Sequence, residues 1–235
     1  MNFGACSGRG HRRWLEKRWR AGWLAGLFAL SGVLTGGQAS PPHTGRDPRP
    51  DNVFAYPAKL SLDLRRVAVL PLAAESSGSG LPEGCAALTP VLWEQLIKTK
   101  RFEVVTVEPK ALRRATGQVN WTGTESLPTD FLGFLRREYA CDGVLFAELT
   151  TYRAYAPLAI GWRFKLVDAR SGQILWASDE LFDAASPPVA RAAQRFGEPR
   201  SSWLFGHEDN WLAVNSPSQF GRFAATTVLD TLPER

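Results

Sequence analysis

The chain has 235 residues, of which 44% are hydrophobic and 22% are charged, values that are ordinary for a globular protein. The formal net charge is +5, and residues 1–39 carry six basic side chains against one acid, so residues 40–235 are neutral. A nucleic-acid-binding domain needs a basic stripe on its folded part. The neutral remainder therefore excludes nucleic acid as a partner.

The first 39 residues have the pattern of a secretory signal peptide. Basic residues within 9–20 precede an uncharged apolar run at 21–35, and small residues follow it. We predict cleavage between Ala39 and Ser40. The apolar run is shorter than the roughly 18–20 residues that span a membrane. An uncleaved N-terminal membrane anchor is the alternative that this pattern leaves open.

Residues 40–60 are predicted to be a proline-rich tether, because residues 40–58 hold five prolines and little periodic apolar pattern. Residues 61–235 are long enough for a single domain with a substantial core. Within this domain we expect an irregular insertion at 197–215.

The first half of the domain alternates strands and helices. The apolar run at 65–72 predicts a strand buried on both faces. A Gly/Ser loop at 75–84 leads to a helix that ends near Lys100, for which Pro90 leaves two starts open: either Thr89 is its N-cap, or the helix begins near Pro82 and contains Pro90. A strand at 102–107, a short helix at 110–116 and a helix at 127–139 follow.

Three consecutive antiparallel strands are predicted over 144–183. Apolar and other residues alternate over 160–166, the pattern of a half-buried strand, so Trp162 should face the core; the same pattern places Trp176 there. Asp168 and Gly172 predict a tight turn in which the glycine has a positive φ.

The C-terminal part should hold two more helices, from Pro187 to about Phe196 and from Pro217, with Ser216 as the N-cap of the latter. The order β-α-β-α-α-β-β-β-α predicts an α/β (α+β) domain, with a mixed sheet of about five strands and helices packed on it. Aromatic residues in the 197–215 insertion are predicted to pin that loop onto the domain, with a partner surface as the alternative. They are Trp203, Phe205 and Trp211.

No catalytic, cofactor or metal site is predicted. Only His43 and His207 follow the leader, without metal-ligand spacing or a nucleophile motif beside them. The loop at 75–84 lacks the lysine of a phosphate-binding loop. Four carboxylates of the hairpin would need a cleft to act as a glycosidase pair, and solvation explains them more simply. They are Asp168, Asp179, Glu180 and Asp183.

Cys85 and Cys141 are predicted not to form a disulfide. Helices connect the first three long strands, which should therefore be parallel. Cys85 then lies near the C-terminal edge of the sheet and Cys141 near its N-terminal edge. A strand spans about 17–20 Å, whereas a disulfide needs Cα atoms within about 7 Å.

Four segments in this order carry a resemblance to known proteins. They are Val67–Pro71, Lys100–Val105, Cys141–Glu148 and Leu166–Trp176. Over residues 64–183 and the C-terminal helix, the chain resembles the superfamily of the curli secretion channel protein (CsgG-like), the lipoprotein activators of penicillin-binding proteins, and the N-terminal domain of the Tol-Pal translocation protein (TolB-like). The resemblance implies a domain like an anticodon-binding domain, exported to the cell envelope and working by protein contact.

We therefore expect a non-catalytic accessory or scaffold protein, in the periplasm or at the periplasmic face of the outer membrane, that binds envelope proteins during envelope assembly or secretion. A periplasmic small-ligand-binding protein or enzyme on the same fold is the alternative. A deep pocket with convergent polar groups would favour the alternative, and a shallow apolar patch the first. The sequence leaves peripheral membrane association and oligomerisation open.

Overall fold

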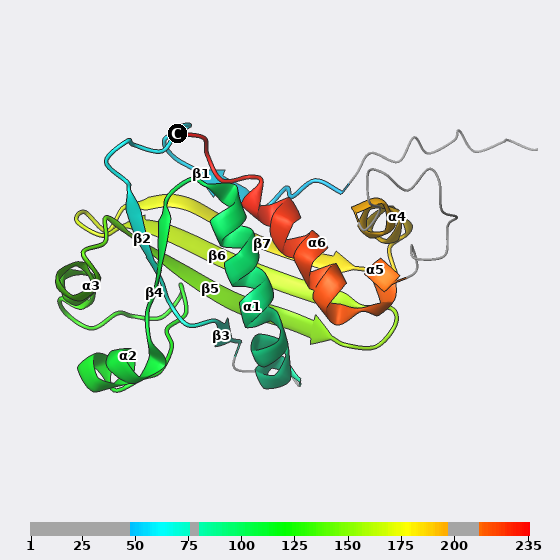
Figure 1. Ribbon diagram of the computed structural model, residues 1–235, viewed down its shortest axis with the longest axis horizontal. Helices are drawn as coiled ribbons and strands as arrows, with labels where there is room; N and C mark the ends of the chain where they lie inside the picture. Colours follow the sequence, from blue (N-terminus) through cyan, green and yellow to red (C-terminus); the bar gives the residue numbers. More distant parts are fainter. Residues whose placement is uncertain (1–47, 76–79, 197–211) are drawn as a thin grey trace, which may run out of the picture. The chain divides into compact units, whose positions relative to one another are not determined.

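The computed structural model describes residues 48–75, 80–196 and 212–235. Within these ranges, one mixed sheet of seven strands has the order β1-β7-β6-β5-β2-β4, and the short strand β3 pairs with β5 (Figure 1). The strands are β1 (Val53–Ala55), β2 (Arg66–Val69), β3 (Ala73–Ala74), β4 (Glu103–Thr106), β5 (Gly143–Arg153), β6 (Ala159–Asp168) and β7 (Ile174–Asp183). The helices are α1 (Leu81–Thr99), α2 (Pro109–Thr116), α3 (Phe131–Tyr139), α4 (Pro187–Phe196), α5 (Leu212–Asn215) and α6 (Pro217–Leu229).

The strand directions confirm the expected fold class. Strand β2 lies parallel to both β4 and β5, as strands joined through helices should. Strands β5, β6 and β7 are antiparallel. The sheet also contains β1 and β3, which the sequence did not predict, because strands of three and two residues are too short to show alternation. Strand β1 lies within the segment predicted to be a tether.

Helices α1 and α6 cover one face of the sheet side by side (Figure 1). Helix α1 begins at Leu81 and contains Pro90, which decides between the two predicted starts. Two polar contacts join the helices: Arg222 Nη2 lies 2.8 Å from Glu94 Oε2, and Thr226 donates to Gln95 over 3.0 Å. Below them lies the main apolar core.

Helices α2 and α3 lie on the opposite face, toward the β4 end of the sheet (Figure 1). Leu112 of α2, Phe131 of α3 and Trp121 of the connecting loop form a second apolar cluster with Phe146 of β5. Helix α3 begins at Phe131, so the predicted start at residue 127 is wrong. Position 127 precedes a proline, which disfavours helical backbone in the residue before it.

The turn between β6 and β7 has the predicted construction. Asp168 Oδ1 accepts hydrogen bonds from the backbone N–H groups of Arg170 and Ser171, over 2.9 and 2.7 Å. Gly172 has φ 72°, as expected. Trp162 and Trp176 are both fully buried, which confirms the register of the two strands.

Helices α4 and α6 agree with the sequence, whereas α5 (Leu212–Asn215) lies at the end of the 197–215 stretch that was predicted to be irregular. A helix of four residues is too short to show an apolar period in the sequence. Helix α4 covers the predicted range, and Ser216 caps α6 by accepting from the backbone N–H of Gln219. Within the described ranges, no helix is both long and apolar enough to cross a membrane. Several predictions concern residues outside the described ranges: the cleavage between Ala39 and Ser40, the two histidines His43 and His207, and the aromatic residues Trp203, Phe205 and Trp211.

Candidate functional site

Among the residues that the structure describes, the sheet has one partly open face, on the side away from α1 and α6. The apolar cluster under α2 and α3 includes side chains of β2 and β5 but only the turn end of β6. Beyond it, over β6, β7 and β1, large apolar side chains meet solvent: Phe54 is 52% exposed and Leu181 58%. We call this surface, made of Phe54, Arg163, Lys165, Ala177, Asp179 and Leu181, the open face.

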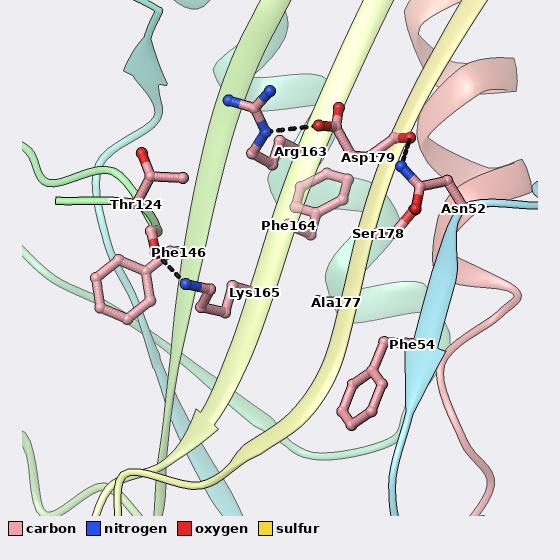
Figure 2. Close-up of a pocket in the computed structure, with 11 residues that line it drawn as sticks. Asn52, Phe54, Thr124, Phe146, Arg163, Phe164, Lys165, Ala177, Ser178 and Asp179 are labelled. Carbon is pink, nitrogen blue, oxygen red and sulfur yellow. Dashed lines mark hydrogen bonds and ion pairs between the residues drawn. The ribbon is translucent and has the colours of Figure 1, made fainter.

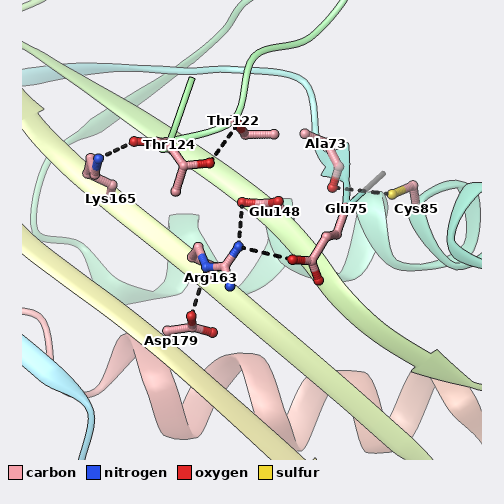
Figure 3. A network of polar contacts seen from close by, with 10 residues as sticks. Ala73, Glu75, Cys85, Thr122, Thr124, Glu148, Arg163, Lys165 and Asp179 are labelled. Carbon is pink, nitrogen blue, oxygen red and sulfur yellow. Dashed lines mark hydrogen bonds and ion pairs between the residues drawn. The ribbon is translucent and has the colours of Figure 1, made fainter. Parts of the chain in front are cut away.

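A row of four charged side chains crosses the strands on this side (Figure 3). The register places Arg163 of β6 opposite Asp179 of β7 and Glu148 of β5, and Glu75 follows β3, which pairs with β5. Arg163 Nε donates to Asp179 Oδ2 over 2.8 Å, and its Nη1 lies 3.3 Å from Glu148 Oε2 and 3.7 Å from Glu75 Oε1. We call Asp179, Arg163, Glu148 and Glu75 the charged row.

Glu148 is the buried member of this row, with 3% of its surface exposed. Burial penalises the charged carboxylate and raises the pKa of Glu148, although the neighbouring Arg163 guanidinium opposes that rise. The carboxylates of Glu75 and Asp179 raise the pKa further. Arg163 is therefore the shared counter-ion of three carboxylates, and one of them, Glu148, is buried.

A shallow hollow lies beside the charged row (Figure 2). Its volume is about 180 Å³, and Phe54, Phe146 and Ala177 line it together with Lys165. The ammonium of Lys165 donates to the carbonyl oxygen of Gly123, so the loop between α2 and α3 forms one border of the hollow. At the opposite border Asn52 Nδ2 donates to the carbonyl oxygen of Asp179 over 3.1 Å.

The hollow suits a side chain better than a whole small molecule. Pockets for small molecules usually measure about 300–1,000 Å³ and enclose most of their ligand. This hollow is smaller and mainly apolar, and it opens onto a surface that carries exposed apolar side chains. Such a surface favours contact with another macromolecule.

A second depression, of about 380 Å³, extends along α3 from its N-cap Asp130 to its C-terminal end. It is polar, and its charged groups are largely matched to one another. Arg137 lies 2.6 Å from Asp130, and Arg170 lies 3.9 Å from Asp142. Cations at the C-terminal end of a helix also compensate the helix dipole, which accounts for the basic side chains without a ligand.

The four carboxylates considered in the hairpin do not converge. Asp168 caps the turn, and Asp183 pairs with Arg153 over 2.6 Å. Asp179 belongs to the open face, whereas Glu180 accepts from the backbone N–H of Asn52 over 2.7 Å. Among the described residues, no group of three or more histidine, cysteine, aspartate and glutamate side chains has the geometry of a metal site.

Sequence reasoning missed the charged row and Phe54. One signal was present: Glu148 interrupts the otherwise apolar start of β5, and a charge inside a buried strand needs a partner. The partner could not be named, because it depends on the pairing of β3, β5, β6 and β7. Phe54 lies on a three-residue strand in a segment that the sequence marks only by its prolines.

Comparisons with known proteins give a partial likeness of fold. No family model and no curated protein matches the chain. Lipoprotein GNA1162 from Neisseria meningitidis is 18% identical over 52% of this chain and 85% of its own, with a TM-score of 0.40. A PelC dodecamer from Paraburkholderia phytofirmans is 15% identical over 81% and 96%, with 0.39. The C-terminal domain of LpoB from Escherichia coli is 20% identical over 50% and 82%, with 0.34. TM-scores below 0.5 say nothing of a shared function.

Proposed function

We propose that this chain is an exported, non-catalytic accessory or scaffold protein of the cell envelope, and that it acts through protein contact on the open face. The observation that carries the proposal is the exposure of Phe54, which lines the hollow of about 180 Å³, and of Leu181, farther along β7 on the same face. Large apolar side chains gathered on one surface are typical of protein-binding sites.

The simplest alternative explanation of the open face is an ordinary solvated sheet. Antiparallel sheets often have one face in water, and that face is then polar. Here β7 presents Ala177 and Leu181 on that face, and β1 adds Phe54. A face that is always in water does not explain why these positions hold apolar side chains. A protein partner that covers them does explain it.

The leader supports export, since its basic, apolar and small-residue order is that of a secretory signal. The periplasm or the periplasmic face of the outer membrane is therefore the proposed location. The small-ligand or enzyme alternative would need a deep pocket with convergent polar groups. The larger depression at α3 is instead a polar surface feature in which arginines pair with aspartates, so we propose no second function.

The test is photo-crosslinking in cells of the source organism. A photoreactive amino acid replaces Phe54 or Leu181 on the open face, and Ile97 on α1, which is 62% exposed, serves as the matched control. We expect discrete adducts from the two open-face positions with an envelope protein that mass spectrometry identifies, and none from position 97. Cell fractionation should find the protein in the envelope with Ser40 as its N-terminus.

Two results would overturn the proposal. One is a set of adducts formed only with cytoplasmic proteins. The other is the absence of adducts from both open-face positions while the purified protein converts a small molecule.

A further inference from the structure

The charged row has more carboxylates than cations. Three carboxyl groups share Arg163, and only Asp179 makes a short hydrogen bond with it. The next cation on this face, Lys165, donates to a backbone carbonyl at the border of the hollow. Counting both cations against Glu75, Glu148 and Asp179 leaves one carboxylate in excess on this face.

Two of these carboxylates can accept further hydrogen bonds from a partner. The side chains of Glu75 and Asp179 are each 41% exposed. The distance of 3.7 Å from Glu75 to Arg163 is too long for a hydrogen bond. Arg163 binds Asp179 at Oδ2, and within the described residues the other oxygen, Oδ1, accepts no hydrogen bond. A lysine or arginine from outside would find acceptors on both sides of Arg163.

The apolar hollow adjoins this acidic surface. Asp179 itself contributes to the wall of the hollow, together with Phe54 and Ala177, and it lies two residues along β7 from Ala177, the residue that pairs with Phe54 of β1. A segment that inserts an apolar side chain beside Phe54 therefore brings its neighbouring residues to the charged row.

We propose that the open face binds a segment of an envelope protein in which a lysine or arginine is adjacent to a bulky apolar side chain. This inference rests on the proposed function and names the chemistry of the partner. The apolar side chain would fill the hollow and provide most of the affinity. The cation would join Asp179 and Glu75 and provide specificity, as charged groups at the edge of an interface usually do.

Two other occupants of the open face are a second copy of this chain, which charge disfavours, and the basic leader, which its predicted removal disfavours. A second copy of this chain would bring two surfaces with the same carboxylate excess together, and like charges across an interface oppose binding. The basic leader of this chain has the matching charge, but its sequence predicts that it is removed on export. A foreign cationic segment satisfies both the charge and the shape of the surface.

The experiment uses random peptides displayed on phage and selected on the purified full chain. A synthetic peptide of the most enriched sequence is then measured by fluorescence polarisation against the wild type and four variants. Glu75→Gln with Asp179→Asn removes two exposed charges, Asp179→Glu keeps the charge, and Phe54→Ala empties one wall of the hollow. Glu138→Gln on α3 removes an exposed carboxylate elsewhere and serves as the matched control. Thermal melts establish that every variant is folded.

We expect enriched peptides that place lysine or arginine beside leucine, phenylalanine or tryptophan. Their affinity should fall by about tenfold or more in the double variant and in Phe54→Ala, and should be retained in Asp179→Glu and in Glu138→Gln. Raising the salt concentration should weaken binding to the wild type more than to the double variant.

Several outcomes would overturn the inference. Peptides without basic residues, or an affinity unchanged in the double variant, would remove the role of the charged row. Concentration-dependent dimers that Phe54→Ala abolishes would assign the face to a second copy. Tighter binding by a synthetic peptide of residues 9–20 would assign it to the leader. If crosslinks to an envelope protein still form at Phe54 and Leu181 in cells, the proposed function survives any of these results.

Discussion

Arg163 on β6 lies 3.3 Å from the carboxylate of Glu148 on β5, a side chain that is almost completely buried. The same guanidinium donates its shortest hydrogen bond to Asp179 on the other side. The buried carboxylate therefore shares its counter-ion with a more exposed one. A buried charge whose partner is shared is costly to keep ionised, which agrees with the raised pKa of Glu148.

Replacement of Glu148 should change how stability depends on pH. Because burial raises the pKa of Glu148 in the folded protein, the folded state holds its proton more tightly than the unfolded chain does. The free energy of unfolding should therefore fall as the pH rises from the ordinary glutamate range through the raised pKa. Glu148→Gln cannot titrate, so its stability relative to the wild type should increase over that interval, by about 1.4 kcal/mol for each pKa unit of the rise.

Urea denaturation between about pH 4 and about pH 8 measures this difference. The groups that face Glu148 are Arg163, Glu75 and Asp179, and all three are unchanged in the variant, so their own titrations largely cancel. Glu138→Gln, at an exposed site on α3, should show no comparable trend. A stability difference between Glu148→Gln and the wild type that stays constant with pH would contradict the expectation.

The charged row marks the limit of what the sequence could predict. Alternation along β6 placed Trp162 in the core correctly, because that inference needs only the period of one strand. The contact between Arg163 and Glu75 needs the pairing of β3 with β5, and β3 has two residues. Long-range pairing of so short a strand leaves no local pattern, so the site could not be assembled from the sequence.

Gly172 should be sensitive to substitution because of its backbone alone. Its φ is 72°, and the nearest atom to an added Cβ would be Leu132 Cδ1 at an ordinary contact distance of 3.7 Å. Gly172→Val should therefore destabilise the protein by about 1–2 kcal/mol through left-handed strain. Asparagine tolerates this conformation better, so Gly172→Asn should lose less. Urea denaturation of both variants checks the order, and equal losses would show that contacts rather than φ limit this site.

Trp162 should contribute heavily to stability, since its indole is fully buried and stacks on Phe164 at 5.5 Å between ring centroids. Trp162→Ala should cost about 3–5 kcal/mol of the free energy of unfolding, as other large-to-small changes in a core do. Thermal or urea denaturation followed by circular dichroism measures this loss. A loss below about 1 kcal/mol would mean that the core closes over the cavity.

Trp176 offers a matched comparison for the polar part of the indole. Its Nε1 donates to Thr231 Oγ1 over 3.0 Å, whereas Trp162 Nε1 has no hydrogen-bond partner among the described residues. Both rings are fully buried, so Trp→Phe makes a similar change of volume at each site. Trp176→Phe should therefore be the more destabilising of the two, by about 0.5–1.5 kcal/mol. The opposite order would place a partner on Trp162 Nε1.

The helices show the same division between local and long-range information. Ser216 and Pro217 marked the start of α6 correctly, because a cap depends on neighbouring residues only. The predicted start of α3 was four residues too early. The apolar repeat reaches back to residue 127, but Pro128 disfavours helical backbone at that residue. The proline restricts the backbone of the residue before it, whatever the apolar pattern predicts.

Cys85 and Cys141 should both be free thiols, even in an oxidising compartment. The structure shows them unpaired, and the parallel pairing of β2 with β5 explains why. Cys85 lies on α1, which follows the C-terminal end of β2, and Cys141 precedes the N-terminal end of β5. The sheet therefore separates them by the length of a strand, about 17–20 Å. Denaturation without reductant, followed by titration with Ellman's reagent, should find both.

The native protein should react more slowly than the denatured chain. Burial raises the pKa of Cys85 to about 11, and its thiol donates to the carbonyl oxygen of Ala73 over 3.6 Å. Only about one molecule in a thousand then carries the Cys85 thiolate at pH 8, and the thiolate is the reactive form. Burial also raises the pKa of Cys141. Rapid native modification at Cys85 would contradict this environment, and the absence of both thiols from oxidised monomer would contradict the parallel sheet.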